Sequence, residues 1–263
     1  MYYLEKYFKG LWKDRYVLIS LVKQDLQMKY NRSVLGIAWS IITPMGLALI
    51  IGLIYSVIFN TDPRTLVPLL FAGLNPWSFI SSSADGSTFS YLGAEGYIKQ
   101  TTVSPQIFPI RVVIVGFVNL LYSIIAFFTI YLFMAPEKFH PRMLMVFPGL
   151  AILFIAVVAI ANISSVINLF FRDYQPLQSL ILQGLFYVTP IIFTTNMLDE
   201  KGYSLVYKLN PFYYFIEIVR TPMLGVHIPG ISVYLVAITL SIILLAISII
   251  LVVKACKGLA LKL

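Results

Sequence analysis

A run of twenty-nine residues without a charged side chain, from Ser33 to Thr61, constrains the fold of this chain more than any other feature. A bilayer core is about 30 Å thick, and a helix needs about 20 mostly apolar residues to cross it. The whole chain shares this character, since 59% of its 263 residues are hydrophobic and only 11% are charged, against about 25% in soluble domains. We therefore expect an integral membrane protein.

Six charge-poor windows are long enough to be membrane spans, namely residues 34–59, 66–90, 112–134, 144–170, 176–193 and 231–253. None of them alternates apolar and polar residues as the strands of a membrane β-barrel do. The predicted fold class is an all-α integral membrane protein with six transmembrane helices. Placing both termini in the cytoplasm puts most of the 19 Lys and Arg on the inner side, as the positive-inside rule requires.

Residues 1–33, which precede the first window, are predicted to form an N-terminal cytoplasmic interface helix. Its apolar side chains recur at spacings of three and four and so share one helical face, comprising Trp12, Tyr16, Ile19, Val22, Leu26 and Tyr30. A helix with an aromatic-rich face and a basic face lies in the plane of the membrane interface. Two roles remain open, an anchor alone or an anchor that also contacts a cytoplasmic partner.

The cytoplasmic connection 91–108 is longer than the two to eight residues that usually join neighbouring helices. A short amphipathic helix that stops near Pro105 fits this segment. The connection is therefore either a docking surface for a partner or a loop that lies on the headgroups.

The outer segment 194–230 is too interrupted to be a span and too apolar to be a free loop. Asn210 followed by Pro211 is a good helix start. Glu217 and Arg220 are three residues apart and can pair, and Gly225 can end the helix. We expect re-entrant helices here, which dip into the outer leaflet before the last span.

Asp85 lies in the most polar window, among the serines of residues 81–88. An ionisable group inside a span is a functional candidate, although Asp85 could also lie at headgroup level or cap a neighbouring helix. The chain has no P-loop, zinc-protease or serine-hydrolase motif, and its one cysteine, Cys256, excludes a disulfide or thiolate metal cluster. We expect no metal, no cofactor and no catalytic residue, and the net charge of +8 beside an anionic membrane indicates lipid contact, with no nucleic-acid partner.

Five short segments occur in an order that resembles a known family. They are residues 25–39 with Pro44 following, the sequence Ala-Gly-Leu-Asn-Pro-Trp at 72–77, Phe-Arg-Asp at 171–173, Thr-Pro-Ile at 189–191, and Leu-Asn-Pro-Phe at 209–212 with Arg220 beyond. The chain resembles the membrane subunit of type-2 ABC exporters that move O-antigen, capsule or teichoic-acid glycans. The connection 91–108 departs from that family's pattern, because Phe-Pro occurs four residues after Ser104-Pro105.

The resemblance implies a transport subunit without its own ATPase site, working as a homodimer with two copies of an ABC ATPase subunit that binds ATP and Mg²⁺. It places the chain in the bacterial inner membrane, moving a lipid-linked polysaccharide. Connection 91–108 would be the coupling loop, braced by the interface helix, and residues 194–230 would lie near the exit.

Three groups of residues are candidates for these roles. Those expected to couple to the ATPase are Lys23, Lys29, Arg32, Tyr97, Ile98, Lys99, Val103, Pro105, Phe108, Arg172 and Asp173. Those expected to line the substrate path, because aromatic faces pack on sugar rings, are Trp39, Tyr55, Phe59, Trp77, Phe186 and Tyr187, together with Asp85. Those expected in the outer re-entrant helices are Asn210, Pro211, Glu217 and Arg220.

Two rival functions remain open. The first is a type-2 ABC permease for drugs, lipids or other small amphiphiles. The second is a membrane-embedded transferase with Asp85 as its acid or base.

Overall fold

The computed structural model describes residues 2–30, 35–134, 137, 139–256 and 259, and it contains helices and no strands within those residues. The helices are α1 (Tyr2–Lys13), α2 (Arg15–Tyr30), η1 (Gly36–Ala38), α3 (Trp39–Phe59), α4 (Pro63–Thr88), η2 (Leu92–Ala94), α5 (Glu95–Gln100), α6 (Ile107–Met134), η4 (Pro141–Met145), α7 (Val146–Phe170), α8 (Tyr174–Val188), α9 (Thr195–Asp199), α10 (Ser204–Lys208), α11 (Pro211–Leu224) and α12 (Ile231–Ala255). The predicted all-α class is confirmed for this part of the chain.

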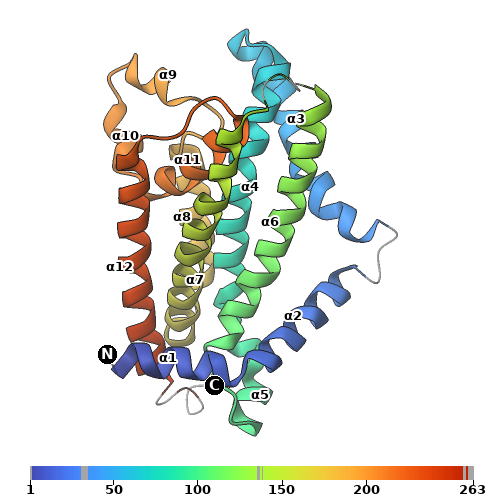
Figure 1. Ribbon diagram of the computed structural model, residues 1–263. Coiled ribbons are helices and arrows are strands. Elements are labelled where there is room, and N and C mark those ends of the chain that lie inside the picture. Colours follow the sequence, from blue (N-terminus) through green and yellow to red (C-terminus); the bar gives the residue numbers. More distant parts are fainter. Residues whose placement is uncertain (1, 31–34, 135–136, 138, 257–258, 260–263) are drawn as a thin grey trace.

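The long helices run side by side, with short helices at both ends (Figure 1). The basal end carries α1, α2, α5 and the turn between α7 and α8, and the apical end carries α9, α10 and α11. Helix α12 runs the length of the bundle and its C-terminal end meets α1 at the basal end (Figure 1). This agrees with termini on one side of the membrane, while the side itself stays a prediction.

Within the described residues, four helical segments are long and apolar enough to cross a membrane, and these are Trp39–Ile58, Ile107–Leu132, Pro141–Phe170 and Ile231–Ala255. Helix α4 has 26 residues, enough to cross, but its serines make it too polar for that group. Protein covers this polarity, because α4 packs against α3, α6, α7, α8 and α11. Ser83, Ser87 and Thr88 are accordingly buried.

The predicted fifth span, residues 176–193, does not form one continuous helix. Helix α8 has 15 residues, or about 22 Å at 1.5 Å per residue, which is short of a bilayer core. It ends at Val188 because Pro190 lacks an N–H and disfavours the helical conformation for Thr189. The plan of six spans therefore stays a prediction.

The N-terminal segment forms two helices, whereas the sequence predicted one. The break is at Asp14, whose buried carboxylate accepts a hydrogen bond from the backbone N–H of Ser104 at 2.7 Å. The predicted apolar face is also divided: Trp12 and Tyr16 are 71% and 70% exposed, whereas Val22 is buried. A pattern that is regular in the sequence thus falls on two helices, with Asp14 between them bonded to a distant segment.

Pro44 lies inside α3 and leaves the carbonyl of Ser40 without its helical donor. The hydroxyl of Ser123, on α6, donates to that carbonyl at 2.6 Å. A neighbouring helix thus satisfies the freed group, as membrane helices with proline require.

Candidate functional site

Helix α1 is fastened to the segment that leads from α5 into α6. Gln106 donates from its side-chain amide to the carbonyl of Tyr7 at 3.0 Å, close to the Asp14–Ser104 bond. Gly10 lies against the same segment, where a Cβ would overlap the Gln106 amide nitrogen. Helix α1 and this segment therefore form one unit.

Tyr7 connects that unit to α7. Its ring is buried, and Asn162 donates from its side-chain amide to the phenol oxygen at 2.7 Å. Burial raises the pKa of Tyr7 to about 12, so the phenol stays neutral at every physiological pH. A movement of the basal unit would thus be transmitted to the core helix α7.

Helix α2 is joined to α6 by a bidentate ion pair between Asp25 and Arg111. Both side chains are partly buried. Sequence patterns did not predict this pair, because 86 residues separate its members. The available signals were an acid within a basic helix and an arginine directly before an apolar window.

Helix α5 also presents exposed residues at the basal end. Tyr97 and Lys99 are exposed, and Lys99 pairs with Glu95 at 2.6 Å. Arg172 and Asp173 are exposed in the turn between α7 and α8. The pKa of Glu95 is lowered, mainly by Lys99 and slightly by Arg172, which places that turn within electrostatic reach of α5.

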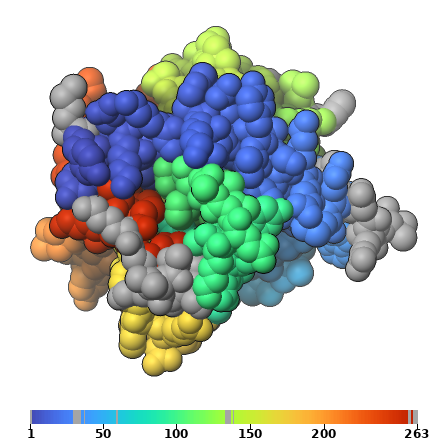
Figure 2. Space-filling view, turned by 90° about the horizontal axis from the view of Figure 1, so that it is seen from below, coloured from blue at the N-terminus to red at the C-terminus, as the bar shows by residue number. Residues whose placement is uncertain are grey.

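Figure 2 shows these segments on one face, with α1 and α2 across one half, α5 near the centre and the α7–α8 turn at the opposite edge. We define the basal surface as α1, α2, residues 91–106 and residues 171–173. The sequence predicted a short helix that stops near Pro105. Helix α5 instead ends earlier, at Gln100.

The predicted coupling residues do not all reach this surface. Ile98, Val103 and Pro105 are half-buried. Phe108 is only 2% exposed and packs under Tyr97, with ring centroids 6.3 Å apart, so its own ring does not reach the basal surface and its coupling role stays a prediction. The ring is buried because the chain enters the core as soon as α6 begins.

Among the basic candidates on α2, Lys23 is exposed. Lys29 lines a cavity between α3, α4 and α6, away from α5. Arg32 lies outside the described residues.

The predicted aromatic path separates into different places. Trp77 is buried, and its ring centroid lies 5.8 Å from that of Phe186 and 5.6 Å from that of Phe212. Tyr187 is exposed beside Phe186, and Trp39 is exposed at the start of α3.

Tyr55 is half-buried on α3, and the side chain of Phe59 is outside the description. Trp77 and Phe186 are thus the only pair of these candidates that the described residues place in ring contact across two helices. Within the described part of one chain these candidates do not gather along a single path, and their role in the substrate path stays a prediction.

Asp85 joins α4 to α8. One carboxylate oxygen accepts hydrogen bonds from Gln178 at 3.2 Å and from Ser179 at 3.0 Å. Gln178 in turn accepts from Ser164 at 2.6 Å, so the carboxylate belongs to a helix-joining network. Asp85 therefore links two helices through side-chain hydrogen bonds, and its functional role stays a prediction.

At the apical end, Asn210 caps α11 as the sequence predicted. Its side-chain oxygen accepts from the N–H of Phe212 at 3.0 Å, and its amide donates to the hydroxyl of Thr189 at 2.8 Å. Pro211 occupies the first turn, and Gly225 ends the helix with φ of 67°. The start and end of this helix are confirmed.

A buried arginine of α11 also links this helix to the chain just beyond the end of α8. Arg220 pairs with Glu217 at 2.6 Å and donates to the carbonyl of Pro190 at 2.5 Å. Thr221 donates to the other oxygen of Glu217 at 2.6 Å. Two segments far apart in the sequence, residues 189–191 and 209–220, are thereby held together.

The described residues contain no group of three or more His, Cys, Asp or Glu that could hold a metal ion.

Comparison with known proteins agrees with this architecture. Residues 16–224 match the family described as ABC-2 type transporter. Two proteins named O-antigen export system permease protein RfbA from Klebsiella pneumoniae are 32% and 30% identical, each over 78% of both chains. A protein of the same name from Myxococcus xanthus is 27% identical over 77% of this chain and 78% of its own length. The chain is therefore a member of the ABC-2 type transporter family.

Proposed function

We propose that this chain is the permease half of an ATP-driven exporter that moves a lipid-linked polysaccharide of the O-antigen type across the bacterial inner membrane. The observation that carries the proposal is the match over residues 16–224 together with the O-antigen export names of the relatives. The absence of a P-loop from the sequence agrees with ATP and Mg²⁺ being bound by a separate partner.

The basal surface is the proposed seat of that ATPase. Tyr97 offers an exposed aromatic side chain, and Lys23, Lys99 and Arg172 offer positive charge. Aromatic and arginine side chains at the centre of an interface carry most of its binding energy. We assign the partner contact to α5 and the α7–α8 turn, with Lys23 at the margin.

Coupling would follow the contacts that lead inward from this surface. A displacement of α5 would be transmitted to α1 by the hydrogen bonds of Ser104 and Gln106. From α1 it would be transmitted to α7 by the hydrogen bond between Tyr7 and Asn162. The Asp25–Arg111 pair links α2 to the start of α6. Each link is a hydrogen bond or ion pair between elements, so displacement of the seat would move α6 and α7.

The polysaccharide would pass between two copies of the chain, since the aromatic candidates that the structure describes are dispersed within one copy. Helix α11, held to α8 by Arg220, would form part of the exit. Two copies of the chain and two of the ATPase are the proposed assembly.

The proposal is tested by purifying the chain with the ABC ATPase encoded beside it and reconstituting both into vesicles. We expect a stable complex and ATP-dependent movement of a lipid-linked glycan. Small drugs should stimulate ATP hydrolysis less than the glycan lipid does. No complex, or drug-stimulated hydrolysis with no glycan movement, would refute the proposal.

The seat is tested by Tyr97→Ala and Arg172→Glu. Both should weaken ATPase binding about ten-fold or more, as loss of a central interface residue does, without changing membrane insertion. Lys254→Glu is the matched control for Arg172→Glu, because Lys254 is exposed at the end of α12, outside the proposed seat. If Arg172→Glu and Lys254→Glu weakened ATPase binding equally, the assignment of the contact to α5 and the α7–α8 turn would be refuted.

A further inference from the structure

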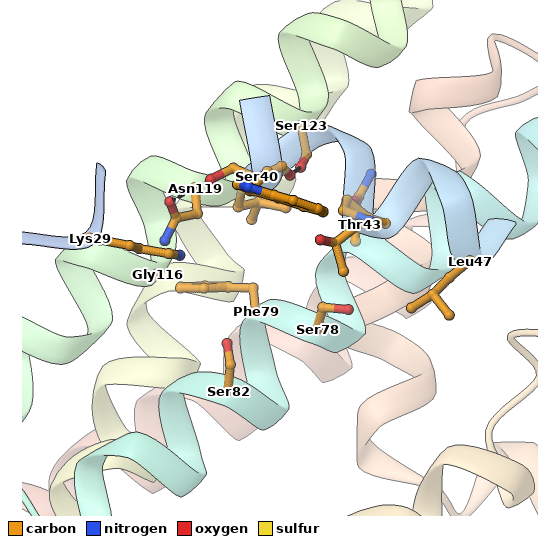
Figure 3. A pocket seen from close by; sticks show the side chains of 14 residues that line it. Lys29, Ser40, Thr43, Leu47, Ser78, Phe79, Ser82, Gly116, Asn119 and Ser123 are labelled. Atoms are coloured by element: carbon orange, nitrogen blue, oxygen red, sulfur yellow. Dashed lines mark hydrogen bonds between the residues drawn. The ribbon is translucent and has the colours of Figure 1, made fainter. Parts of the chain in front are cut away.

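Two hollows open where α3, α4 and α6 meet, and they differ in polarity. The hollow nearer the basal end has a volume of about 330 Å³ and polar walls, which include Asn75, Ser78 and Asn119 (Figure 3). The hollow nearer the apical end has a volume of about 340 Å³, and we call it the apical groove. Apart from Arg64, the described residues that line it are apolar or aromatic. Such walls offer water few partners, so a hydrocarbon chain suits the apical groove better than water does.

The floor of the apical groove is a stack of aromatic rings. Phe71 on α4 stacks on Phe127 on α6, with ring centroids 5.5 Å apart, and Phe127 stacks on Tyr131 at 5.1 Å. All three side chains are buried. The hydroxyl of Tyr131 donates to the carbonyl of Leu224 at 3.2 Å, so its hydrogen bond is made within the chain. The floor is therefore formed before any ligand arrives.

The apical groove is closed between α3 and α4 and open between α3 and α6. Gly52 on α3 lies against Val67 on α4, where a Cβ would come within 2.5 Å of a Val67 methyl carbon. The lining residues Leu49 and Leu53 on α3 and Ile130 on α6 are exposed. Both α3 and α6 are apolar enough to cross a membrane, so the open side lies at the depth of bilayer hydrocarbon.

The length of the apical groove matches an acyl chain within one leaflet. Helix α3 rises about 12 Å from Met45 to Leu53, at 1.5 Å per residue, and α4 rises by the same amount from Pro63 to Phe71. One leaflet contributes about 15 Å of hydrocarbon, which is half of the bilayer core. A chain that enters at the apical end would contact the groove through most of its leaflet.

Arg64 places a positive charge at the apical end of the groove. Its side chain is exposed in the first turn of α4, where a positive charge does not stabilise a helix. Its guanidinium has no ion pair or hydrogen bond among the residues that the structure describes. Asp62, the neighbouring acid, caps α4 by accepting from the backbone N–H of Arg64 at 2.9 Å. A phosphate is the anion that a guanidinium binds best through paired N–H donors.

A headgroup bound to Arg64 also has space beside the groove. A third hollow of about 340 Å³ borders Arg64 and shares Pro68 and Tyr131 with the apical groove. Its lining includes the hydroxyl residues Thr65 and Thr194. The polar and the apolar parts of one amphiphile thus find matching surroundings on adjoining sides of α4.

We propose that the apical groove holds one acyl chain of an anionic phospholipid, with Arg64 contacting the phosphate. The occupant is a lipid of the membrane itself, which fills the opening between α3 and α6, and is not the transported molecule. The inference goes beyond the proposed function, because it depends on these contacts and on the membrane class alone. It holds whatever the exporter carries.

The test is native mass spectrometry of the full chain, purified in detergent and titrated with dioleoyl phosphatidylglycerol. We expect one tightly bound lipid per copy of the chain. Dioleoylglycerol has the same acyl chains and no phosphate, and it should bind about ten-fold more weakly, since a hydrogen bond to a charged group is lost. Glycerophosphoglycerol, the headgroup without acyl chains, should not bind measurably.

Two variants test the charge and the groove separately. Arg64→Gln should weaken binding of phosphatidylglycerol about ten-fold, and Arg64→Lys should retain most of the affinity. Lys201→Gln removes a positive charge from another exposed site of the apical end and should leave binding unchanged. Leu53→Trp fills the groove and should weaken binding several-fold. Its matched control is Ile54→Trp, because both residues are 54% exposed on α3 and only Leu53 lines the groove.

Equal affinity for phosphatidylglycerol and dioleoylglycerol would overturn the proposal, as would unchanged binding by Arg64→Gln. Equal effects of Leu53→Trp and Ile54→Trp would place the lipid elsewhere on α3 and so refute the groove as its site. If no lipid is retained and Leu53→Trp instead separates dimers of the chain, a second copy covers the groove and the proposal is wrong.

Discussion

The buried ion pair between Glu217 and Arg220 allows the sharpest prediction about stability. The two side chains are 12% and 6% exposed, and Arg220 also donates to the carbonyl of Pro190. Glu217→Gln keeps the shape of the side chain but removes its charge, which leaves a guanidinium buried without a counter-ion. We expect this change to loosen α11 from the end of α8.

The expected loss is about 3 kcal/mol in the free energy of unfolding. Removing one partner of a buried ion pair usually costs about 3–5 kcal/mol. The lower end applies because glutamine can still accept the hydrogen bond from Thr221. The measurement is reversible unfolding in mixed micelles titrated with dodecyl sulfate and followed by circular dichroism.

A double-mutant cycle with Arg220→Met separates the ion pair from general disturbance. The double variant buries no charge, so it should be more stable than the sum of the two single losses predicts. Glu200→Gln, at an exposed acid of the same outer segment, should change stability by less than about 0.5 kcal/mol. A loss below about 1 kcal/mol for Glu217→Gln, or strictly additive losses, would refute the reasoning.

Three further predictions concern the basal end and α3. Gly10→Val should lower the free energy of unfolding by about 1–3 kcal/mol, because the added side chain overlaps Ser104 and Gln106. Gly93→Val places its side chain in open space and should lower it much less, so equal losses would contradict this account. Ser123→Ala should lower the free energy of unfolding by about 1 kcal/mol, because the Ser40 carbonyl loses its donor. In a Pro44→Ala background the backbone N–H of residue 44 can bond that carbonyl, so the same change should have almost no effect. Burial raises the pKa of Cys256 to about 11. Iodoacetamide should therefore react with Cys256 roughly 100-fold more slowly at pH 8 than with an unperturbed thiol, and the rate should rise up to pH 11. A rate that is already constant by pH 9.5 would contradict the raised pKa.

Hydropathy placed five of the six windows on single long helices, and the polar window 66–90 is among them, since it corresponds to α4 (Pro63–Thr88). The windows 34–59, 112–134, 144–170 and 231–253 correspond to α3, α6, α7 and α12, with ends that differ by a few residues. Pattern reasoning failed for 176–193, because hydropathy continues past Pro190 while the helical hydrogen bonds do not.

The site residues also differ in how well the sequence predicted them. Residue type and spacing were enough to predict the cap at Asn210 and the pair of Glu217 with Arg220, since these contacts lie within one helix. The same reasoning placed Phe108 on a surface, although it is buried beneath Tyr97. It also could not show that Lys29 borders a cavity, because the other walls come from three separate helices.

The sequence by itself determined the membrane class, the all-helical composition, the missing nucleotide motif and the local helix signals, because each depends on residues close together in the chain. Only the tertiary structure decided that Asp14 interrupts the N-terminal helix, that Asp25 pairs with Arg111 and that polar faces of α3, α4 and α6 meet around Asn75. A hydrogen bond or ion pair forms only when two groups come within about 3 Å in the right orientation. For groups some ninety residues apart, that condition depends on how the helices pack and not on the order of the residues.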